Sequence, residues 1–110
     1  MTKNAQGKLK NELTFLVREA YKEVLDSQEI RFEKPGKIGE DTPIYGNNGY
    51  IDSLGLVNLV VAIEERMQEK FNVFLSLASE KAMSRTKSPF RDVKSLSLYL
   101  KELLKEKTDE

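Results

Sequence analysis

The chain has 110 residues with 39% hydrophobic and 33% charged side chains, which fits one domain over residues 1–110 with its core at about 8–106. It contains no cysteine and no histidine, which excludes disulfides, thiol nucleophiles and imidazole bases, and disfavours both a zinc site and a catalytic role. The formal net charge is zero, no apolar run approaches the ~18 residues that span a membrane, and the N-terminus lacks an apolar signal segment, so we expect a cytoplasmic protein.

The first predicted element is a helix over about residues 8–25. Its apolar residues recur at spacings of three and four and cover an arc of about 100°, as expected of a helix with one buried face. They are Leu9, Leu13, Leu16, Val17, Ala20 and Val24. We assign this helix to the core.

A long loop follows over residues 26–51, where the helical period is lost. Prolines, glycines and paired asparagines indicate turns, and a loop of this length in a small domain is either functional or poorly ordered. We expect apolar contacts, more than backbone pairing, to hold it against the helices. The expected anchors are Ile30, Phe32, Ile44, Tyr45, Tyr50 and Ile51.

The second predicted helix starts at Asp52 or Ser53 and continues to about Lys70, with Asp52 as a good N-cap. It has two apolar stripes. The core stripe consists of Leu56, Leu59, Val60, Ile63 and Met67. The opposite stripe consists of Leu54, Val57 and Val61, beside Glu64, Glu65 and Gln68. Because one stripe faces the core, we expect the other to be exposed to solvent or a partner.

The remainder is predicted as an apolar connector over residues 71–77, a short helix over 79–84, a basic loop over 85–91 and a last helix over about 92–106. Asp92 is the second N-cap candidate. The core stripe of the last helix consists of Val93, Leu96, Leu100, Leu103 and Leu104. The predicted fold is an all-α bundle of three main helices and one short helix. Six residues are expected to be buried in it: Leu13, Leu16, Leu59, Ile63, Leu96 and Leu100.

Charge is unevenly distributed along the chain. Residues 40–69 contain six acidic residues and one basic residue, a net charge of −5, whereas both flanking segments are positive. A nucleic-acid-binding protein places a basic stripe on its functional element. We therefore expect a partner with a basic surface, and no nucleic acid.

The most specific motif is Asp52-Ser53-Leu54, at the boundary between the long loop and the second helix. A helix N-terminus favours a phosphodiester, because free N–H groups and the positive end of the helix dipole meet the anion there. An exposed serine hydroxyl at this position is accessible to a modifying enzyme. On its own, the triplet also fits an ordinary helix cap.

In context, the triplet resembles the start of the recognition helix of acyl carrier proteins. The resemblance covers residues 52–65, the preceding loop at 41–45 and the entry into the last helix at 90–96, and spans roughly 9–104. It implies a four-helix acyl-carrier-type bundle that is not an enzyme. Such a protein carries acyl groups as thioesters on a covalent 4′-phosphopantetheine arm and delivers them to enzymes of fatty-acid, lipid or related biosynthesis. The arm also supplies the thiol that the sequence lacks.

Carried over residue by residue, the resemblance makes Ser53 the attachment serine and Asp52 the aspartate that supports modification by a phosphopantetheinyl transferase. The partner-binding positions that it implies are Leu54, Val57, Val61, Glu64 and Glu65. The expected partners are the transferase and the enzymes that load and transfer the cargo, acting on a monomeric carrier. The chain departs from the family pattern at Gly55 and Asn58, where acidic residues are frequent, and at Arg66 and Lys70, which dilute the acidity.

Two other interpretations are compatible with the residues. The cargo can be an aminoacyl group, as on a peptidyl or D-alanyl carrier protein, because the loop into the second helix also fits stand-alone carriers outside primary lipid synthesis. The chain can also be a helical adaptor that binds partners without a prosthetic group.

Overall fold

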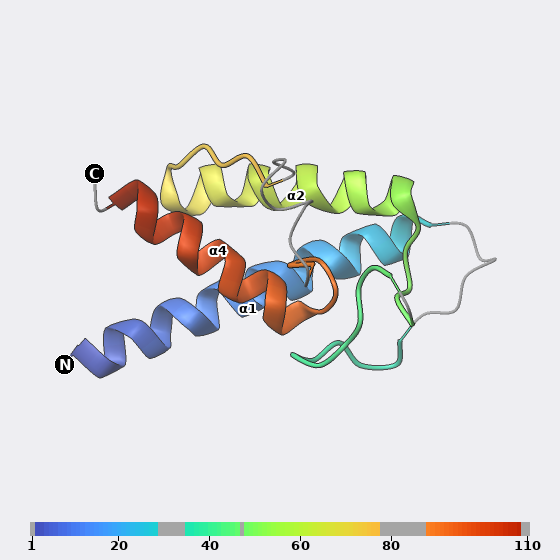
Figure 1. Cartoon of the computed structure of the whole chain (residues 1–110), viewed down its shortest axis with the longest axis horizontal. Helices are drawn as coiled ribbons and strands as arrows, with labels where there is room; N and C mark the ends of the chain where they lie inside the picture. Colours follow the sequence, from blue (N-terminus) through green and yellow to red (C-terminus); the bar gives the residue numbers. More distant parts are fainter. Residues whose placement is uncertain (1, 29–34, 47, 78–87, 109–110) are drawn as a thin grey trace.

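The structure, a computed structural model, describes residues 2–28, 35–46, 48–77 and 88–108. These residues form three helices, α1 (Thr2–Ser27), α2 (Ser53–Phe71) and α4 (Val93–Thr108), and no strand (Figure 1). Helix α1 packs against both α2 and α4. The prediction of an all-α protein is confirmed for the described residues. The short helix expected at 79–84 lies outside them.

The bounds of the helices follow from their caps. Helix α2 begins after Asp52, as predicted, and ends at Phe71. The next residue, Asn72, is the C-cap: it adopts the left-handed conformation (φ 56°), and its N–H donates to the Gln68 carbonyl. Helix α4 begins after Asp92, whose carboxylate accepts from the Ser95 N–H at 2.7 Å. Helix α1 starts at Thr2, six residues before the predicted start, because its first turns lack the apolar stripe on which the prediction depended.

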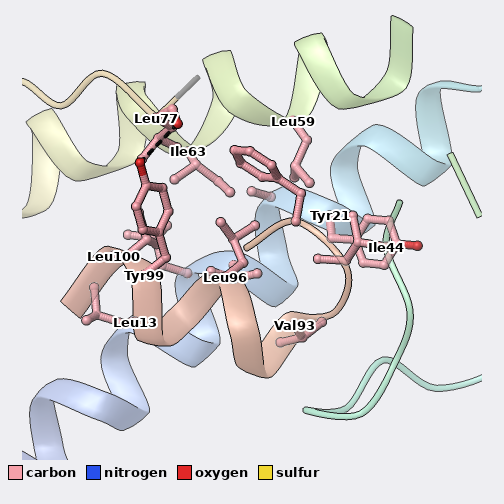
Figure 2. Close-up of a cluster of buried hydrophobic side chains, with 14 of the residues drawn as sticks. Leu13, Tyr21, Ile44, Leu59, Ile63, Leu77, Val93, Leu96, Tyr99 and Leu100 are labelled. Carbon is pink, nitrogen blue, oxygen red and sulfur yellow. Dashed lines mark hydrogen bonds between the residues drawn. The ribbon is translucent and has the colours of Figure 1, made fainter. Parts of the chain in front are cut away.

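The core lies between the three helices (Figure 2). All six residues predicted to be buried are buried: Leu13, Leu16, Leu59, Ile63, Leu96 and Leu100. Two buried tyrosines are not among the predicted core residues. Each can be buried because its hydroxyl has a partner: Tyr99 donates to the Leu77 carbonyl at 3.2 Å, and Tyr21 to the Pro43 carbonyl at 2.7 Å. Burial raises the pKa of the Tyr21 hydroxyl, which favours the protonated form that can donate.

The long loop is fixed to the start of α4 by backbone pairing as well as by apolar contacts. Pro43 and Asp92 form an antiparallel bridge. On one side the Ile44 N–H donates to the Arg91 carbonyl at 2.8 Å, and on the other the Val93 N–H donates to the Thr42 carbonyl at 3.2 Å. The sequence predicts the apolar contacts but not this pairing, because an isolated bridge leaves no periodic pattern in the sequence.

The predicted apolar anchors of this loop behave in three ways. Ile44 and Ile51 are buried, which confirms their role. Tyr45 and Tyr50 are half-buried and pack against the core. Ile30 and Phe32 lie outside the described residues.

The connector after α2 runs back along that helix (Figure 1). It is held there by the Leu77 N–H, which donates to a carboxylate oxygen of Glu64 at 3.0 Å. Leu75 and Leu77 are buried. Phe74, which directly precedes Leu75 in the sequence, is 70% exposed. No helix within the described segments combines the length and apolarity needed to cross a membrane.

Candidate modification site at the start of α2

Ser53 is the first residue of α2, and its side chain is exposed. The cap before it fixes the backbone: Asp52 is extended, with φ −94° and ψ −170°, and its Oδ1 accepts from the Gly55 N–H at 2.9 Å. The Asp52 carbonyl accepts the Leu56 N–H, the first hydrogen bond of the helix. The predicted capping role of Asp52 is confirmed, and the cap places Ser53 at the exposed start of α2.

The loop that leads into the cap folds tightly back on Ile44. The Ile44 carbonyl accepts the N–H groups of both Tyr50 and Ile51, at 3.1 and 3.3 Å. Gly49 packs so closely that a Cβ there would lie 2.5 Å from the Ile44 carbonyl oxygen, closer than any side chain tolerates. These contacts hold residues 49–51, just before the cap, against Ile44. Gly49, which the sequence indicates only as a turn residue, is sterically required there.

A contact that the sequence analysis missed joins this loop to the serine. The Tyr45 hydroxyl lies 3.3 Å from Ser53 Oγ, and either oxygen can donate. The sequence predicts only a loop-anchoring role for Tyr45. The two residues are eight positions apart, in a loop and at a helix start, so no periodic pattern relates them.

The start of α2 is electrostatically suited to an anion. The N–H groups of Ser53 and Leu54 have no acceptor within the helix, since they belong to its first turn, and the helix dipole adds positive potential. The Asp52 side chain is engaged with Gly55. A phosphodiester on the Ser53 hydroxyl would carry its charge at this end of the helix and extend into solvent. The residues present therefore fit the attachment of such a group.

The outer stripe of α2, defined as Leu54, Val57 and Val61, begins beside Ser53. These side chains are 69%, 57% and 48% exposed, which confirms the predicted exposure. Glu65 next to them is exposed as well. An apolar strip that the folded chain leaves in solvent, beside an accessible hydroxyl, is a surface suited to binding a partner.

Glu64, by contrast, has a structural contact. It is half-buried and uses one carboxylate oxygen to accept the Leu77 N–H, which fixes the connector to α2. The predicted role of Glu64 as a partner contact stays a prediction, and only part of its carboxylate is available for that role.

The departures from the carrier pattern in α2 also have structural reasons. Gly55 is buried, and a Cβ at this position would lie 2.8 Å from Ile51 Cβ and 3.1 Å from Gln28 Oε1, so a larger residue does not fit. Arg66 pairs with Glu23 of α1. Its charge is therefore largely compensated at the junction of the two helices.

No family model, no curated protein and no solved structure matches the chain.

Proposed function

We propose that the chain is a carrier protein that receives a 4′-phosphopantetheine arm on Ser53 and carries acyl groups as thioesters on it. The observation that supports the proposal best is the juxtaposition of an exposed serine, at the start of an Asp-capped helix, with an exposed apolar stripe on the same helix. A helix cap alone requires neither the exposed hydroxyl nor the stripe.

Each residue of the site has a role in this proposal. Ser53 provides the hydroxyl that forms the phosphodiester, and Asp52 holds the turn and supports modification by the transferase. The free N–H groups of the first turn of α2 favour the anionic linkage. The bound arm supplies the thiol, which the chain itself lacks because it contains no cysteine.

The outer stripe is the proposed docking surface for the transferase and for the enzymes that load and unload the cargo. Leu54, Val57 and Val61 provide apolar contact, and Glu65 with the acidic segment at residues 40–69 steers a basic partner surface toward it. The proposal includes a fourth, short helix at 79–84, a monomeric state and a cytoplasmic location, and it assigns the chain no catalysis of its own.

A thiol titration tests this proposal. Purified protein is incubated with coenzyme A and a phosphopantetheinyl transferase, purified away from the transferase and from small molecules, and assayed for protein-bound thiol. Because the chain has no cysteine, every thiol that remains belongs to an attached arm. The carrier proposal predicts about one thiol per chain after incubation and none in a sample treated without transferase. A result of no thiol in either sample would favour the adaptor interpretation.

The protein that carries the arm can then be used to identify the class of cargo. Incubation with an acyl-carrier-protein synthetase and a fatty acid is expected to convert the thiol into a thioester. Efficient loading by an amino-acid-adenylating enzyme in place of the synthetase would instead establish an aminoacyl carrier.

A further inference from the structure

The Tyr45 hydroxyl differs in its partner from two other tyrosines of the chain. Tyr21 and Tyr99 donate to backbone carbonyls of the interior. Tyr45 reaches the exposed Oγ of Ser53 at 3.3 Å. A phenol that contacts the one hydroxyl proposed to react can act on that hydroxyl directly.

The backbone holds Tyr45 in place. Its N–H donates to the Phe90 carbonyl at 3.1 Å, and the Ile44 N–H before it donates to the Arg91 carbonyl at 2.8 Å. The Tyr45 ring is half-buried against the core. Figure 1 shows this green segment beside the stretch of chain that leads into α2. The phenol is thus presented from a segment that is hydrogen-bonded to the residues before α4.

Ser53, in contrast, has little else to orient its side chain. A serine at an exposed helix start can occupy several staggered rotamers, and its hydroxyl hydrogen rotates freely. The contact with Tyr45 favours the rotamer that places Oγ toward the loop. Restricting a reacting atom in this way reduces the entropy that is lost when the transition state forms.

We infer that Tyr45 is a positioning residue that orients the Ser53 hydroxyl for attachment of the arm. The inference rests on the proposed function. In the attachment step, Ser53 Oγ forms a bond to the phosphorus of coenzyme A that bears the pantetheine. The pyrophosphate P–O bond to the adenosine half breaks, and adenosine 3′,5′-bisphosphate leaves with the bonding electrons. The Ser53 proton passes to a base of the transferase.

This chemistry determines which hydroxyl donates. The Ser53 proton has to be free to leave toward the transferase, so in the productive arrangement Tyr45 donates and Ser53 Oγ accepts. Oγ retains a second lone pair for the phosphorus. Loss of the Tyr45 hydroxyl therefore affects the chemical step, whereas loss of the outer stripe affects docking.

The kinetic test compares Tyr45→Phe with Tyr50→Phe. Tyr50 is a half-buried tyrosine of the same loop, and its bond to Ile44 is made by its backbone N–H. Attachment is followed by intact mass at varied carrier concentration. Tyr45→Phe is expected to lower kcat roughly three- to tenfold, the effect of losing one neutral hydrogen bond, without changing KM. Tyr50→Phe is expected to match the wild type, and equal melting temperatures show that all three proteins are folded.

A second readout needs no transferase. The Hα–Hβ couplings of Ser53, measured by NMR on the unmodified protein, report its side-chain rotamer. We expect one dominant rotamer in the wild type and in Tyr50→Phe, and averaged couplings in Tyr45→Phe. Averaged couplings in the wild type, or a wild-type kcat in Tyr45→Phe, would overturn the inference alone. A wild-type chain that gains no arm would overturn the proposed function, and this inference with it.

Discussion

Both faces of α2 carry apolar side chains, but only one face is buried. Leu59, Ile63 and Met67 on the inner face are fully buried, while the outer stripe of Leu54, Val57 and Val61 stays in solvent. The side chains of both sets are apolar, so side-chain type alone does not explain the difference in burial. The two faces differ in direction: the inner face packs against α1 and the core, whereas the described residues place no second layer over the outer face. Apolar residues that do not stabilise the fold are typical of a binding surface.

The largest effect is expected when the inner face is truncated. Ile63→Ala removes a fully buried side chain and should cost about 2–5 kcal/mol of unfolding free energy in a denaturant melt. Val61→Ala is the matched control on the outer face and should change the unfolding free energy by less than about 0.5 kcal/mol. Equal losses at the two positions would contradict the assignment of the faces.

A smaller loss is expected at Gly55, where the inner face starts. Gly55→Ala forces the new Cβ against Ile51 and should destabilise the protein by about 1–3 kcal/mol, despite the better helix propensity of alanine. A Cβ at Gly7 of α1 would meet nothing within 4 Å outside its own stretch of helix, so Gly7→Ala should stabilise by up to about 1 kcal/mol. Relative to wild type, the urea midpoint of unfolding should therefore fall for Gly55→Ala and rise for Gly7→Ala. Shifts of the same sign would contradict the assignment of Gly55 to a tightly packed position.

The cap at the start of both faces is expected to contribute less. Asp52→Ala removes the acceptor of the Gly55 N–H and should cost about 1 kcal/mol. Asp52→Asn keeps an acceptor oxygen and should retain most of that stability. If Asp52→Asn nevertheless slows attachment of the arm, the charge of Asp52 acts in modification separately from its capping role. Equal unfolding free energies for wild type and Asp52→Ala would show that the cap does not stabilise the protein.

The smallest effect on stability is expected on the outer face. Val57→Arg should leave the melting temperature almost unchanged, because the side chain is exposed, but it should sharply slow transfer of phosphopantetheine to Ser53. Asn11→Arg, at an exposed position of α1, adds the same charge away from the stripe and should transfer at the wild-type rate. Strong destabilisation would place Val57 in the core, and an unchanged rate would remove it from the docking surface.

The features that could be predicted from the sequence are those with a local pattern. The three-and-four spacing of apolar residues predicts the buried face of α2, and Asp52 before a helical stretch predicts its start. The exposed stripe follows from the same spacing, since apolar residues on the far side of a helix have nothing to pack against in so small a chain.

The features that could not be predicted join residues with no periodic relation. The bond between Glu64 and the Leu77 N–H depends on the path of the connector, and the bridge between Pro43 and Asp92 depends on how the loop meets α4. The contact of Tyr45 with Ser53 depends on how the loop approaches the start of α2. Each depends on the assembled tertiary structure, which a single sequence does not reveal through spacing alone.

The most direct test of the carrier proposal locates the arm by intact mass. Wild type, Ser53→Ala and Ser95→Ala are each incubated with coenzyme A and a phosphopantetheinyl transferase. Ser95 is the control because it also lies in the first turn of an Asp-capped helix. The proposal predicts one added phosphopantetheine on the wild type and on Ser95→Ala, and none on Ser53→Ala, with equal helicity in all three. An arm that persists on Ser53→Ala, or a wild type that gains none, would contradict it.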